Sequence, residues 1–378
     1  MRKKIVYIFL LMLGVMITVN AKDKEAVRGI WLTNVDSDAL YSEQGVKDAV
    51  NTCSELGFNS IFVVVWNKAH TLYPSKIMKG LIGDEIECEL QGRDPLKELI
   101  SEAHKKNIKV FAWFEFGFSS SFEEGGGILI EKRPHWASRN KVGGLVTKNG
   151  FDWLNAFHPE VQEFMLSLII EVVENYDIDG IQGDDRLPAM PSEGGYDDYT
   201  VELYRDTHDG EYPPLDEKDP EWLQWRADIL NNFMAKIYES VKAAKPDVIV
   251  SMAPSLYPWS LEEYLQDWPT WVKEGYVELL CPQVYRYDYD EYVNSLDEAV
   301  NKYLPEEYKN IFYPGILLKV GDYYPEKDFL RKMISMNRKM GIGGEVFFFY
   351  EGVKKFPDLF LKEFYTEETV FPDLSNKK

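Results

Sequence analysis

The sequence predicts a single-domain (β/α)8 barrel, the TIM-barrel class of α/β protein, with a long loop after the fourth strand. Three observations lead to this prediction. Strand-like and helix-like segments alternate along nearly the whole chain, and the strand-like segments number eight. Their β-branched and aromatic residues are typical of buried parallel strands. Eight is also the number of strands at which a parallel βα sheet closes into a packed barrel.

The strands and helices follow one another in a regular order. The predicted strands cover residues 28–33, 60–66, 109–115, 178–184, 248–253, 277–285, 310–316 and 344–350. Helical patterns lie between them at 44–56, 94–106, 159–176, 220–244, 291–303 and 325–340, with a short helix after Ser260. Asp94 is a suitable N-cap and Pro95 suits the first helical position, so they set the start of the second helix. Residues 187–219, rich in Gly and Pro, form the long loop.

An open, doubly wound sheet is the competing architecture. That fold needs a glycine-rich phosphate loop after its first strand. Residues 31–36 read Trp-Leu-Thr-Asn-Val-Asp, which contains no glycine. No internal repeat or low-complexity linker divides the chain. We therefore expect the barrel to occupy residues 22–355, followed by a closing helix and a polar tail over 356–378.

The first 21 residues have the features of a secretory signal peptide. Residues 2–4 are basic, residues 5–19 are apolar, and the small residue Ala21 ends the segment. The apolar stretch is short for a membrane span, and the charged residues 22–25 follow at once. An uncleaved N-terminal anchor is the alternative. We expect an exported protein, periplasmic or extracellular, without stable membrane insertion after cleavage.

The charge balance is strongly acidic. The chain has 42 Lys and Arg against 63 Asp and Glu. Removal of residues 1–21, which hold three basic residues and no acid, would change the net charge from −21 to −24. Such a surface repels phosphate backbones and anionic lipids, which argues against nucleic acid partners. The 10 Trp and 23 Tyr residues instead favour a sugar partner, since their rings stack on the apolar faces of sugars.

Polar and acidic residues directly follow the predicted strands. TIM-barrel enzymes carry their catalytic groups at the C-terminal strand ends and on the loops there. Acids follow three strands, with Glu115 after the third, Asp184 and Asp185 after the fourth, and Glu351 after the eighth. The candidates for substrate contact at the same end are Trp31, Asn34, Trp66, Asn67, Trp113, Gln182, Arg186, Gln283 and Tyr285. Chance surface acids in so acidic a chain are the alternative interpretation.

The alternation of side chains along a strand indicates which acid faces the barrel lumen. Neighbouring residues of a strand point to opposite sides of the sheet. Ile181 suits the helix-facing side, so Gln182 and Asp184 are expected to face the lumen. The same alternation applies to the third and eighth strands. It puts Glu115 on the face of Phe111 and Trp113, and Glu351 on the face of Phe347 and Phe349.

Two carboxyl groups are what glycosidic hydrolysis requires. One attacks the anomeric carbon or activates water, and the other protonates the leaving oxygen. The proton donor needs a raised pKa, which an apolar neighbourhood provides. Glu115 and Glu351 both lie next to aromatic residues, so either is a candidate donor. Asp184, close to Asp185 and Arg186, is expected to remain ionised as nucleophile or base. We predict catalytic roles for Asp184, Glu115, Glu351 and Asp185 on an oligo- or polysaccharide.

Other functions are less well supported by the residues. The five histidines lack metal-ligand spacing, and neither a phosphate loop nor a Gly-x-Ser-x-Gly elbow occurs, so no metal and no cofactor is expected. A non-catalytic glycan-binding barrel stays open as an alternative, because fold does not determine function. A metal-dependent deacetylase or esterase acting on a glycan would need a bound cation.

The sequence also resembles the glycosyl-hydrolase-like family 10 proteins, a barrel group of exported bacterial proteins. The matching segments are 28–36 (RGIWLTNVD), 71–75 (TLYPS), 91–94 (QGRD), 113–118 (WFEFGF), 158–159 (HP), 179–185 (DGIQGDD), 195–197 (GYD), 225–228 (WRAD), 283–286 (QVYR) and 347–351 (FFFYE). The resemblance implies a TIM barrel and hydrolysis of glycosidic bonds in a polysaccharide or peptidoglycan glycan.

One segment of this resemblance concerns the acids directly. Asp184 is similar in position to the nucleophile of amylase-type barrels, which follows an Asp-Gly-x-x-x-Asp pattern. Gly183 stands where the family usually has a bulky residue, and Arg186 where an aromatic residue or His is commoner. These departures keep the acids but leave the shape of the sugar subsites, and hence the substrate, open.

Overall fold

A closed barrel of eight parallel strands is the centre of the computed structural model, which describes residues 24–374. The strands are β1 (Val27–Leu32), β2 (Ser60–Val64), β5 (Lys109–Phe114), β9 (Gly180–Gly183), β10 (Ile249–Met252), β11 (Leu279–Leu280), β12 (Gly315–Leu317) and β13 (Gly344–Phe348). Their order in the sheet is β11-β10-β9-β5-β2-β1-β13-β12. Parallel bridges from Leu280 to Phe312 and from Gln283 to Gly315 join the two ends of this order. The predicted TIM barrel is therefore confirmed.

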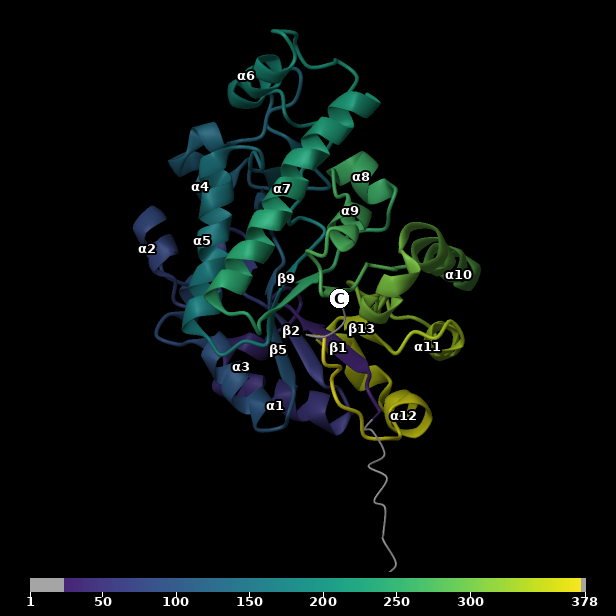
Figure 1. Ribbon diagram of the computed structural model, residues 1–378. Coiled ribbons are helices and arrows are strands. Elements are labelled where there is room, and N and C mark those ends of the chain that lie inside the picture. Colours follow the sequence, from purple (N-terminus) through teal and green to yellow (C-terminus); the bar gives the residue numbers. More distant parts are fainter. Residues whose placement is uncertain (1–23, 375–378) are drawn as a thin grey trace, which may run out of the picture.

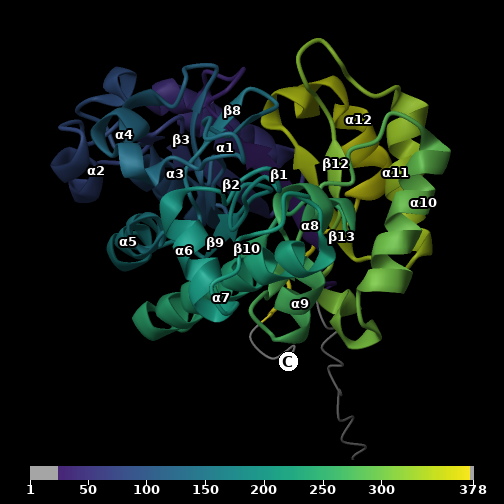
Figure 2. The ribbon, with the colours of Figure 1, turned by 90° about the horizontal axis from the view of Figure 1, so that it is seen from above.

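Helices surround the strands (Figures 1 and 2). They are α1 (Glu43–Glu55), α2 (Lys76–Leu81), α3 (Pro95–His104), α4 (Gly127–Lys132), α5 (Pro159–Asn175), α6 (Asp198–Thr207), α7 (Pro220–Ala244), α8 (Trp259–Tyr264), α9 (Trp268–Lys273), α10 (Tyr289–Glu298), α11 (Lys327–Lys339) and α12 (Pro357–Leu359). Asp94 caps α3 through the main-chain N–H of Lys97, as predicted. Asp219 caps α7 in the same way, and the helix covers the predicted residues 220–244.

The loops contain short elements that the sequence pattern does not reveal. A hairpin of β3 (Trp66–Asn67) and β4 (His70–Thr71) follows β2. A small antiparallel sheet of β6 (Ser119–Phe122), β8 (Phe151–Trp153) and β7 (Thr147–Lys148) follows β5. Helix α6 lies inside the predicted long loop 187–219. Strands of two to four residues are too short for a periodic pattern, which explains why the five short strands were not predicted.

Four predicted strands are shorter or placed differently in the structure. The strand predicted over 277–285 is reduced to Leu279–Leu280, and the one predicted over 60–66 ends at Val64. Residues 306–311 form a 3-10 helix, η5 (Glu306–Ile311), so the predicted strand 310–316 begins only at Gly315. The predicted strand 344–350 ends at Phe348, and the next segment is the 3-10 helix η6 (Tyr350–Lys355). This last difference decides the position of Glu351.

Aromatic rings fill the lumen of the barrel. The rings of Phe62 and Phe111 stack at 4.6 Å, and Trp31 lies 5.9 Å from Phe62 and 6.3 Å from Trp113. Gly180 makes room for this packing, because a Cβ there would lie 2.4 Å from the Phe111 ring. The lumen is thus a packed core, and the space for a substrate lies above it, at the C-terminal strand ends.

The two ends of the described chain meet at the opposite end of the barrel. Val370 pairs in parallel with Glu25, and the Phe371 ring packs 5.7 Å from Phe111. The signal peptide predicted for residues 1–21 lies outside the described residues. Between residues 24 and 374, no helix has both the length and the apolar character that a membrane span requires.

Candidate active site

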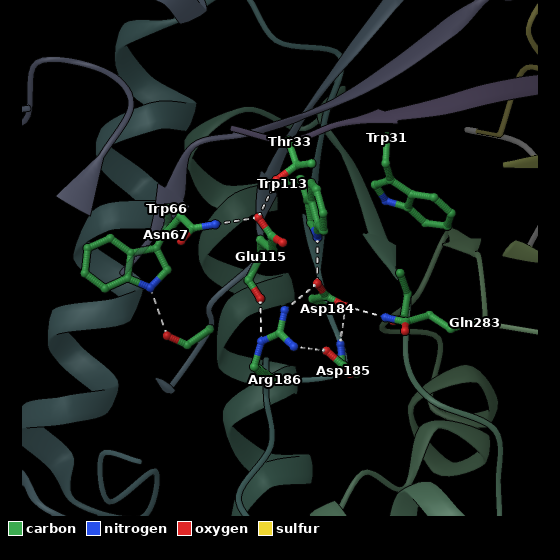
Figure 3. Close-up of polar contacts among 12 residues, drawn as sticks. Trp31, Thr33, Trp66, Asn67, Trp113, Glu115, Asp184, Asp185, Arg186 and Gln283 are labelled. Atoms are coloured by element: carbon green, nitrogen blue, oxygen red, sulfur yellow. Dashed lines mark hydrogen bonds and ion pairs between the residues drawn. The ribbon is translucent and has the colours of Figure 1, made fainter. Parts of the chain in front are cut away.

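Three acidic side chains and one arginine gather where β5 and β9 end (Figure 3). The guanidinium of Arg186 forms ion pairs with Asp184, at 3.3 Å from Nη2 to Oδ2, and with Asp185, at 3.0 Å from Nη1 to Oδ1. Its Nε donates to the main-chain oxygen of Glu115 at 3.0 Å. One cation thereby joins the ends of two neighbouring strands. We call Glu115, Asp184, Asp185 and Arg186 the acid cluster.

Asp184 is a buried carboxylate with every oxygen occupied by N–H donors. Only 2% of its surface is exposed. Its Oδ1 accepts from Gln283 Nε2 at 2.5 Å and from the main-chain N–H of Asp185 at 2.6 Å. Its Oδ2 accepts from Trp113 Nε1 at 3.0 Å and from Arg186. Such a set of four donors matches the charged form of the carboxyl group.

Glu115 is also buried, but its two oxygens differ. Its Oε2 accepts from Asn67 Nδ2 at 2.7 Å and from Thr33 Oγ1 at 3.1 Å. None of the hydrogen bonds among residues 24–374 reaches Oε1. Burial raises the pKa of Glu115, against the opposing effects of Arg186, Asn67 and Thr33. Oε1 is therefore available to carry a proton.

The acid cluster has more negative groups than its single cation can balance. Burial, followed by the charge of Asp185, raises the pKa of Asp184. Burial acts to lower the pKa of Arg186, but the Asp185 and Asp184 carboxylates outweigh it and raise that pKa. A proton on Asp184 would displace one of its donors, whereas Glu115 has a free oxygen. The proton is thus best placed on Glu115, which leaves Asp184 ionised.

Several predicted substrate-contact residues lie beneath the cluster. Gln182 is fully buried, accepts from Trp31 Nε1 at 2.7 Å and donates to Ser251 Oγ at 2.9 Å. Trp31 and Trp113 are 1% and 2% exposed. Because these side chains have almost no exposed surface, they pack beneath the acids and support them instead of contacting substrate. The alternation along β9 is as predicted, with Gln182 and Asp184 on the lumen side.

Trp66 does not join the acid cluster. β2 ends at Val64, and the β3–β4 hairpin turns the Trp66 ring away from Glu115 (Figure 3). The ring is fully buried 5.8 Å from Phe164 of α5, and its Nε1 donates to the main-chain oxygen of Gly117 at 2.9 Å. The expected role of Trp66 in substrate contact is corrected to one in the packing between barrel and helix.

Glu351 and Asn34 lie in a different place from the acid cluster. Glu351 is on η6, where its Oε1 accepts from Ser37 Oγ at 2.8 Å. Both residues line an open hollow of about 910 Å³ whose lining does not include Asp184. The alternation predicted for Glu351 fails because β13 ends at Phe348, whose ring, and not that of Phe347, faces Trp31 at 6.2 Å.

Three other predicted residues do meet the acids. Asn67 and Gln283 bind Glu115 and Asp184 directly. Tyr285 packs 6.4 Å from Trp31 and is partly exposed. Burial, followed by the negative charge of Asp184, raises the pKa of Tyr285.

Sequence reasoning missed three residues around the cluster. Thr33 follows β1 directly, so its position at a strand end could have identified it. Gln266 donates to the main-chain oxygen of Asp184 at 3.0 Å, and the Arg186 guanidinium lies 4.6 Å from the Phe151 ring. No local pattern predicts these last two, because the contacts join segments far apart in the chain.

The fold defines a TIM-barrel protein whose buried acids lie at the C-terminal ends of its strands. The model of the glycosyl hydrolase-like 10 family matches residues 26–312, about three quarters of the chain. The chain belongs to this family. The resemblance noted in the sequence is thereby confirmed.

Two curated relatives carry the name glycosyl hydrolase. DigH of Escherichia coli K12 is 26% identical over 299 residues, which cover 71% of this chain and 64% of DigH. YngK of Bacillus subtilis is 23% identical over 305 residues, which cover 70% of this chain and 55% of YngK. The chain therefore spans between about half and two thirds of the length of these relatives.

Solved structures with the same fold include several glycoside hydrolases. The glycoside hydrolase domain of PgaB (BpsB) from Bordetella bronchiseptica has a TM-score of 0.65 at 14% identity and covers 88% of this chain and 96% of that domain. The catalytic domain of a β-amylase from Paenibacillus polymyxa has a TM-score of 0.57 at 10% identity and covers 88% and 94%. At such low identities the likeness concerns the fold alone.

Proposed function

We propose that this protein is a glycoside hydrolase that cleaves glycosidic bonds in a polysaccharide or peptidoglycan glycan by carboxylate acid/base catalysis. One observation carries the proposal. Arg186 binds the carboxylate of Asp184 and the main-chain oxygen of Glu115, and so joins the two strand ends that carry buried carboxyl groups. Asp184 is saturated with donors, while Glu115 has a free oxygen. Two carboxyl groups whose environments favour opposite protonation states are what this reaction needs.

Glu115 is the proposed proton donor. Its proton on Oε1 would pass to the glycosidic oxygen as the bond to the anomeric carbon breaks, leaving Glu115 ionised. Asn67 and Thr33 would hold Oε2 during this step, and they stabilise the carboxylate that forms. The burial that raises the pKa of Glu115 keeps the acid protonated at higher pH than an exposed Glu.

Asp184 is the proposed nucleophile or base, with Asp185 beside it. Its charged form would either attack the anomeric carbon or remove a proton from the attacking water. Because all four donors come from fixed groups, Asp184 is oriented before substrate binds. Asp185 is more exposed, with 25% of its side chain accessible, and is the member of the cluster closest to solvent.

Two alternatives are weaker. In a non-catalytic glycan-binding barrel, the difference between the two carboxyl groups would have no purpose. Among residues 24–374, no three His, Cys, Asp or Glu side chains are grouped as metal ligands, so no observation favours a metal-dependent deacetylase. The printed names of DigH and YngK support hydrolysis, and the predicted export would bring the protein to cell-wall or external glycans.

A substrate panel tests the proposal. Polysaccharides and peptidoglycan glycan strands stripped of peptide are incubated with the wild type, Asp184→Asn and Glu115→Gln, and the products are identified by mass. We expect the wild type to release shorter glycans and both variants to be at least about a hundredfold slower, the usual scale for loss of acid/base catalysis. Thermal unfolding shows whether the variants remain folded. Near-normal turnover by folded Asp184→Asn would refute the assignment.

A further inference from the structure

Exposed apolar side chains gather around one end of the barrel. Eleven large apolar side chains are exposed between residues 24 and 374. Nine of them lie in segments that follow C-terminal strand ends, namely Val35, Phe122, Val142, Tyr199, Tyr212, Leu215, Trp259, Tyr287 and Val320. Single exposed apolar residues need no explanation, but a one-sided distribution favours a binding face. Because the strands are parallel, this face also carries the acid cluster.

Trp259 lies in a segment that contacts the acid cluster. It is the first residue of α8 and is 48% exposed. Its ring lies 5.3 Å from that of Tyr264, the last residue of the same helix. Gln266, two residues further on, donates to the main-chain oxygen of Asp184 at 3.0 Å, so the segment that carries Trp259 is joined to the cluster.

Tyr287 lies in a second segment that contacts the cluster, at Asp184. It is 65% exposed and follows Gln283, whose side-chain amide donates to Asp184. The Tyr287 ring meets the ring of Tyr323 edge to face at 4.8 Å. Tyr323 is itself held by a pair of main-chain hydrogen bonds with Val320, at 2.9 and 3.2 Å. The exposed Tyr287 ring therefore packs against a residue whose main chain is hydrogen-bonded.

We propose that Trp259 and Tyr287 are sugar-stacking residues of an extended glycan-binding face, so that the substrate is a chain of several sugars and not a terminal sugar alone. This inference rests on the proposed function. Trp259 lies in the segment after β10 and Tyr287 in the segment after β11, and each segment contains a glutamine, Gln266 or Gln283, that donates to Asp184. A ligand that contacts both rings and the acids must be longer than one or two sugars. Tyr and Trp rings offer a large apolar face to the C–H face of a sugar at a small cost in side-chain entropy.

Binding to glycans of graded length tests this proposal without turnover. Asp184→Asn serves as the background, and its affinity is measured for peptide-free peptidoglycan glycan strands and for chitooligosaccharides, from disaccharides to long chains. We expect Trp259→Ala and Tyr287→Ala each to weaken binding of long chains roughly threefold to tenfold and to leave disaccharide binding unchanged. Trp259→Phe and Tyr287→Phe should retain most of the affinity.

Tyr308→Ala is the matched control. Tyr308 is a partly exposed tyrosine of η5, just before β12 and so at the opposite end of the barrel, and its replacement should not change binding. Equal affinity of all variants for long chains, an equal loss for disaccharides, or no binding of any glycan in the panel would overturn the inference. Loss of long-chain binding by both Ala variants, together with a wild type that hydrolyses nothing, would support the inference and refute only the hydrolysis.

Discussion

Asn67 donates its side-chain amide to Oε2 of Glu115 at 2.7 Å, and this contact links the β3–β4 hairpin to the end of β5. The two residues are 48 positions apart in the chain. The contact commits one oxygen of the proposed acid to an acceptor role and leaves the other for the proton. Because the Asn67 amide lowers the pKa of Glu115, it should also affect how the proposed activity depends on pH.

Asn67→Ala should extend activity to higher pH. The Asn67 amide stabilises the charged form of Glu115, so its loss raises the pKa of that acid further above the ordinary Glu value. A general acid must be protonated, so the alkaline limb of the kcat/KM profile should move up by roughly one pH unit. Thr33→Val removes the other donor to Oε2 and should shift the limb in the same direction. A downward shift in both variants would contradict the assignment of Glu115.

Arg186→Met should destabilise the protein in a pH-dependent way. Without the cation, the pKa values of Asp184 and Glu115 rise further in the folded state, while the unfolded values stay ordinary. Stability is therefore retained at low pH and lost as pH rises through the folded pKa values. At neutral pH we expect a loss of about 3–5 kcal/mol in the free energy of unfolding by urea. Arg205→Met, which removes a half-buried surface arginine paired with Glu202, should change little at any pH. A pH-independent loss would argue against charge as the cause.

Glu115→Gln and Glu351→Gln should have opposite outcomes. Glu115 borders Arg186 and has a raised pKa, whereas Glu351 binds Ser37 in a separate hollow. We expect Glu351→Gln to keep kcat within about twofold of the wild type and Glu115→Gln to lose at least about a hundredfold. Steady-state kinetics on a substrate from the panel measures both. The reverse result would transfer the acid role to Glu351.

Arg226→Met should loosen the long segment between β9 and α7. Arg226 is fully buried, and its guanidinium donates to the main-chain oxygens of Ser192, Gly194 and Glu217 at 2.5, 2.7 and 2.6 Å. Their loss leaves buried carbonyl groups without donors, and we expect a decrease of about 3 kcal/mol in the free energy of unfolding. Limited proteolysis should cut first within residues 187–219. Arg331→Met, an exposed replacement, provides the control, and unchanged protease resistance would contradict this role.

Local chemistry made much of the fold predictable. Asp219 and Pro220 start a helix wherever they are followed by an amphipathic run, so α7 appears at the predicted residues. The β-branched and aromatic run at 60–66 favours a buried strand, and the structure has one there, although the last residues of the run form part of the β3–β4 hairpin. The acids of β5 and β9 were predictable because parallel strands end on one side and side chains alternate along them.

What the sequence by itself determined is therefore the barrel and the pair Glu115 and Asp184, since periodicity, capping and strand parity act within a few residues. The tertiary structure alone decided that Glu351 and Trp66 stand apart, because alternation holds only while a strand continues, and both strands end before these residues. It also decided that Gln266 and Phe151 support the acids. Those contacts depend on how loops that are distant in the chain pack together, and a local sequence pattern does not predict such packing.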